Sequence, residues 1–105
     1  CDFVSLKDYD IQPSRIQLHQ NYPNPFNPIT NIKFFVPNNT KYELKVYNVQ
    51  GHYIKFIDEG TGKDKFKALD WNATNNHGHK VPSGVYIVRL EAGVHSKNIK
   101  MLLLK

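Results

Sequence analysis

The segment from Gln20 to Thr30, which reads QNYPNPFNPIT, limits what this chain can fold into more than any other stretch. Its prolines are Pro23, Pro25 and Pro28. Each proline fixes φ at about −65° and removes a backbone donor, so neither a helix nor a central strand can run through the segment. Residues before a proline avoid the α region, which makes the segment extended and irregular. Because a solvated tether has no need of aromatic side chains, we expect Tyr22 and Phe26 to anchor it to a core.

Length and cysteine content set broad limits. The 105 residues are enough for one domain with its own hydrophobic core, without a metal or a disulfide. Cys1 is the single cysteine, and it marks either a fragment boundary, which we favour, or the lipid-bearing first residue of a lipoprotein. No apolar run approaches the ~20 residues of a membrane helix, so we expect no transmembrane segment. A signal sequence, if the protein is exported, would lie upstream.

The net charge of +5 raises the question of a polyanionic partner. The lysines are spread along the chain and alternate with apolar residues, which is typical of the solvated face of strands. No recognition helix and no RNA-binding aromatic motif accompanies them, so we expect no nucleic-acid partner. A weaker attraction to anionic surfaces stays open.

Alternation of apolar and polar residues predicts strands along most of the chain, and no stretch has a helical period. We expect a linker over residues 1–14 and a domain over residues 15–105. The predicted strands cover residues 15–20, 30–36, 42–49, 52–58, 66–72, 85–91 and 95–105. Turn residues separate them at about the 8–12-residue spacing of an antiparallel sandwich, so the fold class is all-β with about seven strands.

The same alternation predicts the core. The residues expected to face inward are Ile32, Phe34, Leu44, Val46, Leu69, Trp71, Tyr86, Val88 and Leu90. Ile16 and Leu18 share a face in the first strand, while Lys33 and Phe35 take the outer face of the second. The pattern slips at Phe56 and Ile57, which indicates a bulge. A buried Trp71 needs a hydrogen-bond acceptor for its indole N–H.

Few residues suggest chemistry. His77 and His79 could offer two imidazoles to zinc, but no further ligands stand at a suitable spacing. The loop that begins at Asp70 lacks the glycine and the closing glutamate of a calcium loop. No serine stands in the sequence context of a nucleophile elbow. We therefore expect no enzyme activity, no catalytic residue, no metal and no cofactor.

Aromatic residues leave one alternative open. Tyr47, Tyr53, Phe35 and Tyr86 would form a platform for sugars if several of them faced outward together. Cross-strand packing pairs explain such residues equally well, and more often. The alternative is that the domain is an accessory module of a secreted hydrolase. Such a module would bind carbohydrate or cell wall, or would have a structural role.

Several separated motifs resemble, in the same order, the type A C-terminal sorting domains of the type IX secretion system. They are Gln20–Pro28 with Thr30, Ile32 and Phe34, then Val46–Gly51, Trp71, Gly78 with Ser83–Tyr86, Arg89–Leu90 and Lys100–Lys105. The resemblance covers about residues 16–105. One departure is Asn72–Ala73, where the family often has an acidic residue followed by glycine.

The resemblance implies an immunoglobulin-like β-sandwich, similar to the flagellar hook-capping Ig-like domain, at the end of a larger secreted protein. Such domains direct their cargo through the periplasm to an outer-membrane translocon. A cell-surface sorting peptidase then usually removes them, and the cargo is released or attached to anionic lipopolysaccharide. The cut would fall in or just before residues 1–15.

The resemblance also assigns residues to roles. The candidates for recognition by the translocon are Gly84, Tyr86, Lys100, Met101, Leu102, Leu103, Leu104 and Lys105. The structural motif comprises Tyr22, Pro23, Asn24, Pro25, Phe26, Gly51, Trp71 and Gly78. An apolar terminal strand must pair within its sheet or meet a partner, and an edge strand can do both. We expect one face of residues 99–103 to complete the core and the last residues to stay accessible.

Overall fold

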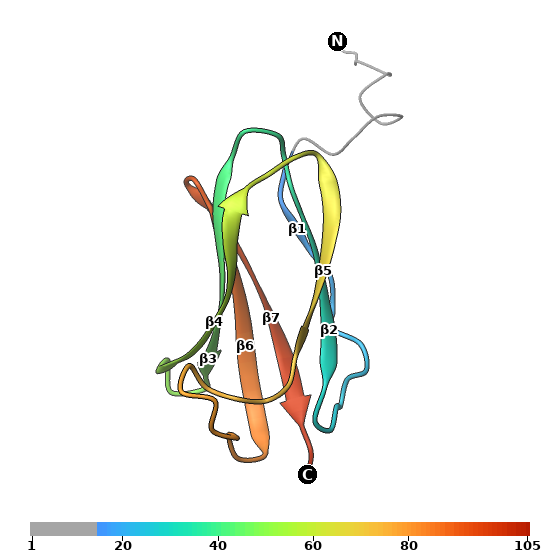
Figure 1. Cartoon of the computed structure of the whole chain (residues 1–105), viewed down its shortest axis with the longest axis vertical. Coiled ribbons are helices and arrows are strands. Elements are labelled where there is room, and N and C mark those ends of the chain that lie inside the picture. Colours follow the sequence, from blue (N-terminus) through green and yellow to red (C-terminus); the bar gives the residue numbers. More distant parts are fainter. Residues whose placement is uncertain (1–14) are drawn as a thin grey trace.

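A computed structural model describes residues 15–105, which form seven strands in two sheets packed face to face (Figure 1). The smaller sheet has the order β1 (Gln17–Leu18), β2 (Thr30–Val36) and β5 (Lys65–Trp71). The larger sheet has the order β4 (Tyr53–Thr61), β3 (Lys41–Asn48), β6 (Gly84–Ala92) and β7 (His95–Leu103). All neighbouring strands are antiparallel. The prediction of an immunoglobulin-like antiparallel sandwich is confirmed, while the linker predicted for residues 1–14 lies outside the described residues.

The predicted core is confirmed, with one residue at its margin. All the expected residues are buried except Leu69, which is partly buried and packs against the cluster. Trp71 ends β5 and packs between two other aromatic rings, with its ring centroid 5.8 Å from that of Phe26 and 5.5 Å from that of Tyr86. Its indole N–H donates to the carbonyl of Thr74 at 2.9 Å, which supplies the acceptor that burial requires.

Two strands differ in detail from the alternation pattern. The first is only two residues long, although Ile16 beside it is buried as expected. Phe35 lies on the outer face of β2, as predicted, yet it is fully buried because it packs against Phe66 with the centroids 5.2 Å apart.

The predicted bulge in β4 is confirmed: Leu44 pairs with Asp58 and the next residue of β3 pairs with Phe56. The residue passed over, Ile57, packs against the core.

The loop at the departure from the family pattern adopts an unusual backbone. Ala73 has φ of 61°, in the left-handed region that normally favours glycine. Its side chain is buried, with 1% exposed, and its carbonyl accepts a hydrogen bond from Val81 N–H. Packing and hydrogen bonding hold an alanine in a conformation that costs an L-residue roughly 1–2 kcal/mol.

The proline-rich segment is anchored by different residues from those expected. Phe26 is buried as predicted, but the prediction for Tyr22 is wrong, because 80% of this residue is exposed. Asn21 anchors the segment instead: it is 2% exposed, and its Nδ2 donates to Thr30 Oγ1 at 2.8 Å and to the Pro23 carbonyl at 3.1 Å. An irregular segment leaves backbone carbonyls without strand partners, and a buried amide satisfies one of them here.

A cluster of three polar side chains joins the two sheets at the side where β4 and β5 form their edges. Tyr42 of β3 donates a hydrogen bond of 2.7 Å to Asp58 Oδ2 of β4, and Lys67 Nζ of β5 lies 2.9 Å from the same oxygen. Burial, and then the bond to Asp58, raise the pKa of Tyr42. The hydrogen bond to Asp58 also raises the pKa of Lys67. We call these three residues the inter-sheet clamp.

The role of Asn21 leads to the first prediction. Asn21→Ala removes two hydrogen bonds, one to the Pro23 carbonyl and one to the Thr30 hydroxyl, which keep only their bond to each other at 2.8 Å. At about 0.5–1.5 kcal/mol for each bond lost, the free energy of unfolding should fall by roughly 1–3 kcal/mol. Tyr22→Ala removes an exposed ring and should change it by no more than about 0.5 kcal/mol. Urea denaturation of both variants measures the difference, and equal losses would contradict our assignment of the anchor.

The inter-sheet clamp predicts a weakening in alkali. The folded-state pKa values of Lys67 and Tyr42 are raised above their ordinary values of 10.5 and 10.0. Their stabilising contribution is therefore complete below about pH 10 and is lost as the pH rises through the folded-state values. The double variant Lys67→Gln, Tyr42→Phe should lose less stability than the native chain between about pH 9 and pH 11.5.

Denaturant unfolding at a series of pH values measures this difference in slope. The exposed pair Lys41→Gln, Tyr22→Phe serves as a matched control and should follow the native chain. A clamp variant with the native slope would show that Tyr42 and Lys67 do not contribute through their ionisation.

Candidate functional site

The predicted recognition residues Lys100–Lys105, here called the terminal segment, divide between core and surface. Met101 and Leu103 of β7 are buried, with 1% and 0% exposed, so they complete the core. Leu102 is half-buried, and Leu104 is 50% exposed. Both lysines of the segment are exposed. The expected division between a core face and accessible last residues is what the structure has.

Gly84 and Tyr86 lie directly beside the terminal segment, on the neighbouring strand β6. In the register of the two strands, Gly84 pairs with Leu103 and Tyr86 pairs with Met101. Tyr86 is 4% exposed, and its hydroxyl donates to the Pro82 carbonyl at 2.6 Å. Burial raises the pKa of Tyr86. The Tyr86 side chain therefore belongs to the core, and any part of it in recognition would act through the position of β6.

The outer edge of the terminal segment is covered by the proline-rich segment. Phe26 N–H donates to the Leu102 carbonyl, and Leu104 N–H donates to the Phe26 carbonyl, each at 3.0 Å. Leu102 N–H donates to Asn24 Oδ1 at 2.9 Å. Gln20 Nε2 donates to the Lys100 carbonyl at 2.7 Å. Because these main-chain groups are already paired, this part of the edge is closed to an added strand.

The side chains that point away from the core form a second surface next to the terminal segment. Residues that are directly paired in the register share one face of a sheet, so Leu102 and Val85 lie together, and Lys100, Ile87 and Tyr47 form the next row. We call this surface the terminal face. It consists of Tyr47, Val85, Ile87, Lys100, Leu102 and the exposed Leu104 that follows them.

Val85 and Ile87 were missed as site residues from the sequence, and Tyr47 was considered only for a sugar platform. The signal was present, because the alternation that places Tyr86 and Val88 inward places their neighbours outward. Large apolar residues on an outward face are the informative exception to ordinary patterning. Val85 is 36% exposed, and Ile87 and Tyr47 are half-buried.

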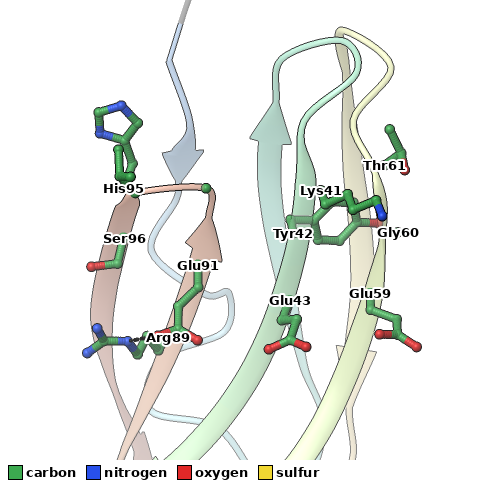
Figure 2. Close-up of a pocket in the computed structure, with 12 residues that line it drawn as sticks. Lys41, Tyr42, Glu43, Glu59, Gly60, Thr61, Arg89, Glu91, His95 and Ser96 are labelled. Carbon is green, nitrogen blue, oxygen red and sulfur yellow. Dashed lines mark hydrogen bonds and ion pairs between the residues drawn. The ribbon is translucent and has the colours of Figure 1, made fainter.

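Farther along the same face of the large sheet, the side chains become charged. Lys45 and Arg89 form one row, and the next row contains Glu91, Glu43 and Glu59 on the adjacent strands β6, β3 and β4 (Figure 2). Like charges directly opposite each other destabilise a sheet, and two cations offset them here. Lys45 Nζ lies 3.0 Å from Glu43 and Arg89 Nε lies 2.9 Å from Glu91. The hydrogen bond to Glu43 raises the pKa of Lys45.

These glutamates line an open groove of about 750 Å³ at the end of the sheet where β6 turns into β7. Val94 in that turn is 95% exposed. The outer face of the large sheet thus changes from apolar beside the terminal segment to charged at its opposite end. An apolar partner surface would match only the first of these two ends.

The other candidate chemistry is not assembled. His77 and His79 are exposed in their loop, with ring centroids 6.3 Å apart, and no group of three or more potential metal ligands occurs within residues 15–105. The four aromatic residues that were considered for a sugar platform do not gather on one surface. Tyr47 and Tyr53 lie 6.0 Å apart on the large sheet, whereas Phe35 is on the small sheet and Tyr86 is in the core. The part of the chain that the structure describes has no helix long and apolar enough to cross a membrane.

Comparison with known proteins identifies a matching family and two similar structures. A family model described as a secretion system C-terminal sorting domain matches residues 20–105. The crystal structure of dimeric latent PorU from Porphyromonas gingivalis is similar over 90% of this chain, with a TM-score of 0.69 and 17% identity. PorZ, a surface component of the type IX secretion system of the same organism, is similar over 96%, with a TM-score of 0.54 and 22% identity.

The chain spans 10% of the PorU chain and 12% of the PorZ chain, and at these identities the likeness shows the fold alone. A search of curated proteins found no match.

The covered edge leads to a prediction that is local to one amide. Asn24→Ala removes the acceptor of Leu102 N–H, so hydrogen exchange at this amide should become at least about tenfold faster. The Leu104 amide, which is bonded to the Phe26 carbonyl, should keep its protection. Exchange followed by NMR at single residues measures both. Unchanged protection at Leu102 would show that the Asn24 side chain does not hold this amide.

Proposed function

Because the chain belongs to the family of secretion system C-terminal sorting domains, we propose that it directs a larger cargo protein through the outer membrane by the type IX system, and that the secretion machinery reads the terminal face. The family is one of sorting signals, not of enzymes, and its members act with secretion machinery to bring cargo to the cell surface or beyond. The translocon contact and the fate of the domain are the parts that we add.

The proposed contact rests on exposed apolar side chains beside a strand edge whose backbone groups are already paired. Leu104, 50% exposed, and Val85, 36% exposed, lie at one end of the large sheet. The main-chain groups of Leu102 are already bonded to Asn24 and Phe26. A partner therefore meets side chains and not free backbone, so we infer recognition by an apolar pocket instead of strand addition.

The same proposal includes removal of the domain by a cell-surface sorting peptidase. A peptidase cleaves a linker before a folded domain more readily than it cleaves the sheets of a sandwich. The predicted cut in or just before residues 1–15 is compatible with a domain whose first strand begins at Gln17. The cargo is then released or attached to anionic lipopolysaccharide.

Export of a reporter tests the terminal face. The full chain is fused behind a periplasmic reporter in a host with this secretion system, and the exported fraction is measured. Leu104→Asp and Val85→Asp each place a charge on the terminal face, and each should lower export at least about tenfold because a charge left unpaired in an apolar contact is costly. Val94→Asp is the matched control at the opposite end of the sheet, and export should be unchanged.

Melting temperatures of all three variants separate recognition from folding. Removal of Met101–Lys105 would not do so, because Met101 and Leu103 are core residues. Normal export of a stable Leu104→Asp variant and a stable Val85→Asp variant would contradict recognition through the terminal face. Retention of the native fusion inside the cell would contradict the sorting role itself.

A further inference from the structure

The ring of Tyr22 has no structural task, although it lies in the proline-rich segment among residues that do. Asn21, Asn24 and Phe26 each bond or pack against the rest of the domain, whereas 80% of Tyr22 is exposed. The backbone of Tyr22 pairs with Asn31 through two hydrogen bonds of 3.0 and 2.8 Å. Since paired residues share a face, the ring lies on the outer face of the small sheet, away from the terminal face.

A second exposed ring lies at the other end of that outer face. Phe66 of β5 is 44% exposed, and it is held from several sides. Phe35 packs beneath it, the His19 ring meets it edge-on with the centroids 5.3 Å apart, and Lys33 Nζ lies 4.8 Å from its centroid. These contacts fix the orientation of the ring before any ligand arrives, which lowers the entropy lost on binding.

Hydrogen-bonding groups occupy the space between the two rings. Asn31 Nδ2 donates to Asp70 Oδ1 at 2.9 Å across the strands, and both side chains are exposed. The next row contains Lys33 and the small, exposed Ala68. The rows at Asn31 and Phe35 are four residues apart, which corresponds to about 13 Å along a strand.

We propose that this surface, the aromatic face formed by Tyr22, Phe66, His19, Asn31, Lys33 and Asp70, binds a linear polysaccharide of pyranose units. The flat C–H faces of pyranose rings stack on the two aromatic rings, and the ring hydroxyls bond to the amide, carboxylate and imidazole groups between them. The face is longer than a single sugar ring, so the ligand is a polymer. Lys33 and the engagement of Asp70 by Asn31 allow acidic as well as neutral sugar units.

The chemistry of the face favours a polysaccharide over a protein partner. Protein interfaces depend on a desolvated centre of anchor side chains. The centre of this face instead holds the exposed polar pair Asn31 and Asp70, whose groups suit sugar hydroxyls. The face is also unsuited to a lipid surface, because its centre consists of polar side chains. This binding is separate from sorting, since the terminal face lies on the other sheet.

Titration calorimetry with the full 105-residue chain tests the proposal. The probes are soluble xylan, a mixed-linkage β-glucan, chitin oligosaccharides and alginate. At least one should bind saturably. Tyr22→Ala and Phe66→Ala should each weaken that binding by about fivefold or more, the loss expected for one stacked ring. Phe66→Tyr keeps a ring and should keep the affinity.

Tyr53→Ala is the matched control, because Tyr53 is 50% exposed on the large sheet. It should bind like the native chain, and Tyr22→Ala should still be exported when fused to the reporter. The absence of saturable binding to every probe would overturn the proposal, as would equal losses in Tyr53→Ala and Tyr22→Ala. Capture of a protein through Tyr22 that no polysaccharide displaces would overturn it too. The binding measurements do not depend on the sorting role.

Discussion

The main-chain pairing of Phe26 with Leu102 and Leu104 is the contact on which the rest of the structure depends. The segment that leads into the small sheet thereby bonds to the outer edge of the large sheet. The Phe26 side chain continues inward to Trp71, so one residue links backbone and core. The prolines around it keep the crossing extended, because they exclude helix and central strand. The motif thus closes the sandwich on the side where it would otherwise open.

Regular strands could be predicted from the sequence, and side chains in irregular segments could not. Alternation identified the sheets, the bulge at Ile57 and nearly all of the core, because burial on one face of a strand has a fixed period. It could not distinguish Asn21 from Tyr22, since burial in a proline-rich segment depends on which backbone groups lack partners. The terminal face was recoverable from the outward positions of β6. The inter-sheet clamp was not, because a lysine in an apolar strand pattern does not reveal the acid on another strand.

The sheet edges share a common protection against unwanted pairing. On β4, Asn76 imitates a neighbouring strand: its N–H donates to the Ile54 carbonyl and its Oδ1 accepts from Phe56 N–H. On β5, Lys65 and Lys67 occupy positions opposite the inward residues Val36 and Phe34. Charged residues that point inward on an edge strand discourage edge-to-edge association. Edges protected in this way do not aggregate.

The two ends of the described chain lie at opposite ends of the sandwich, and this has a consequence for the protein to which the domain is joined. The described chain enters at the end where β1 begins, and the terminal segment leaves at the opposite end (Figure 1). Under the proposed function, the full length of the strands separates the cargo protein from the secretion machinery that binds the terminal segment. The size and shape of the cargo then have little influence on docking.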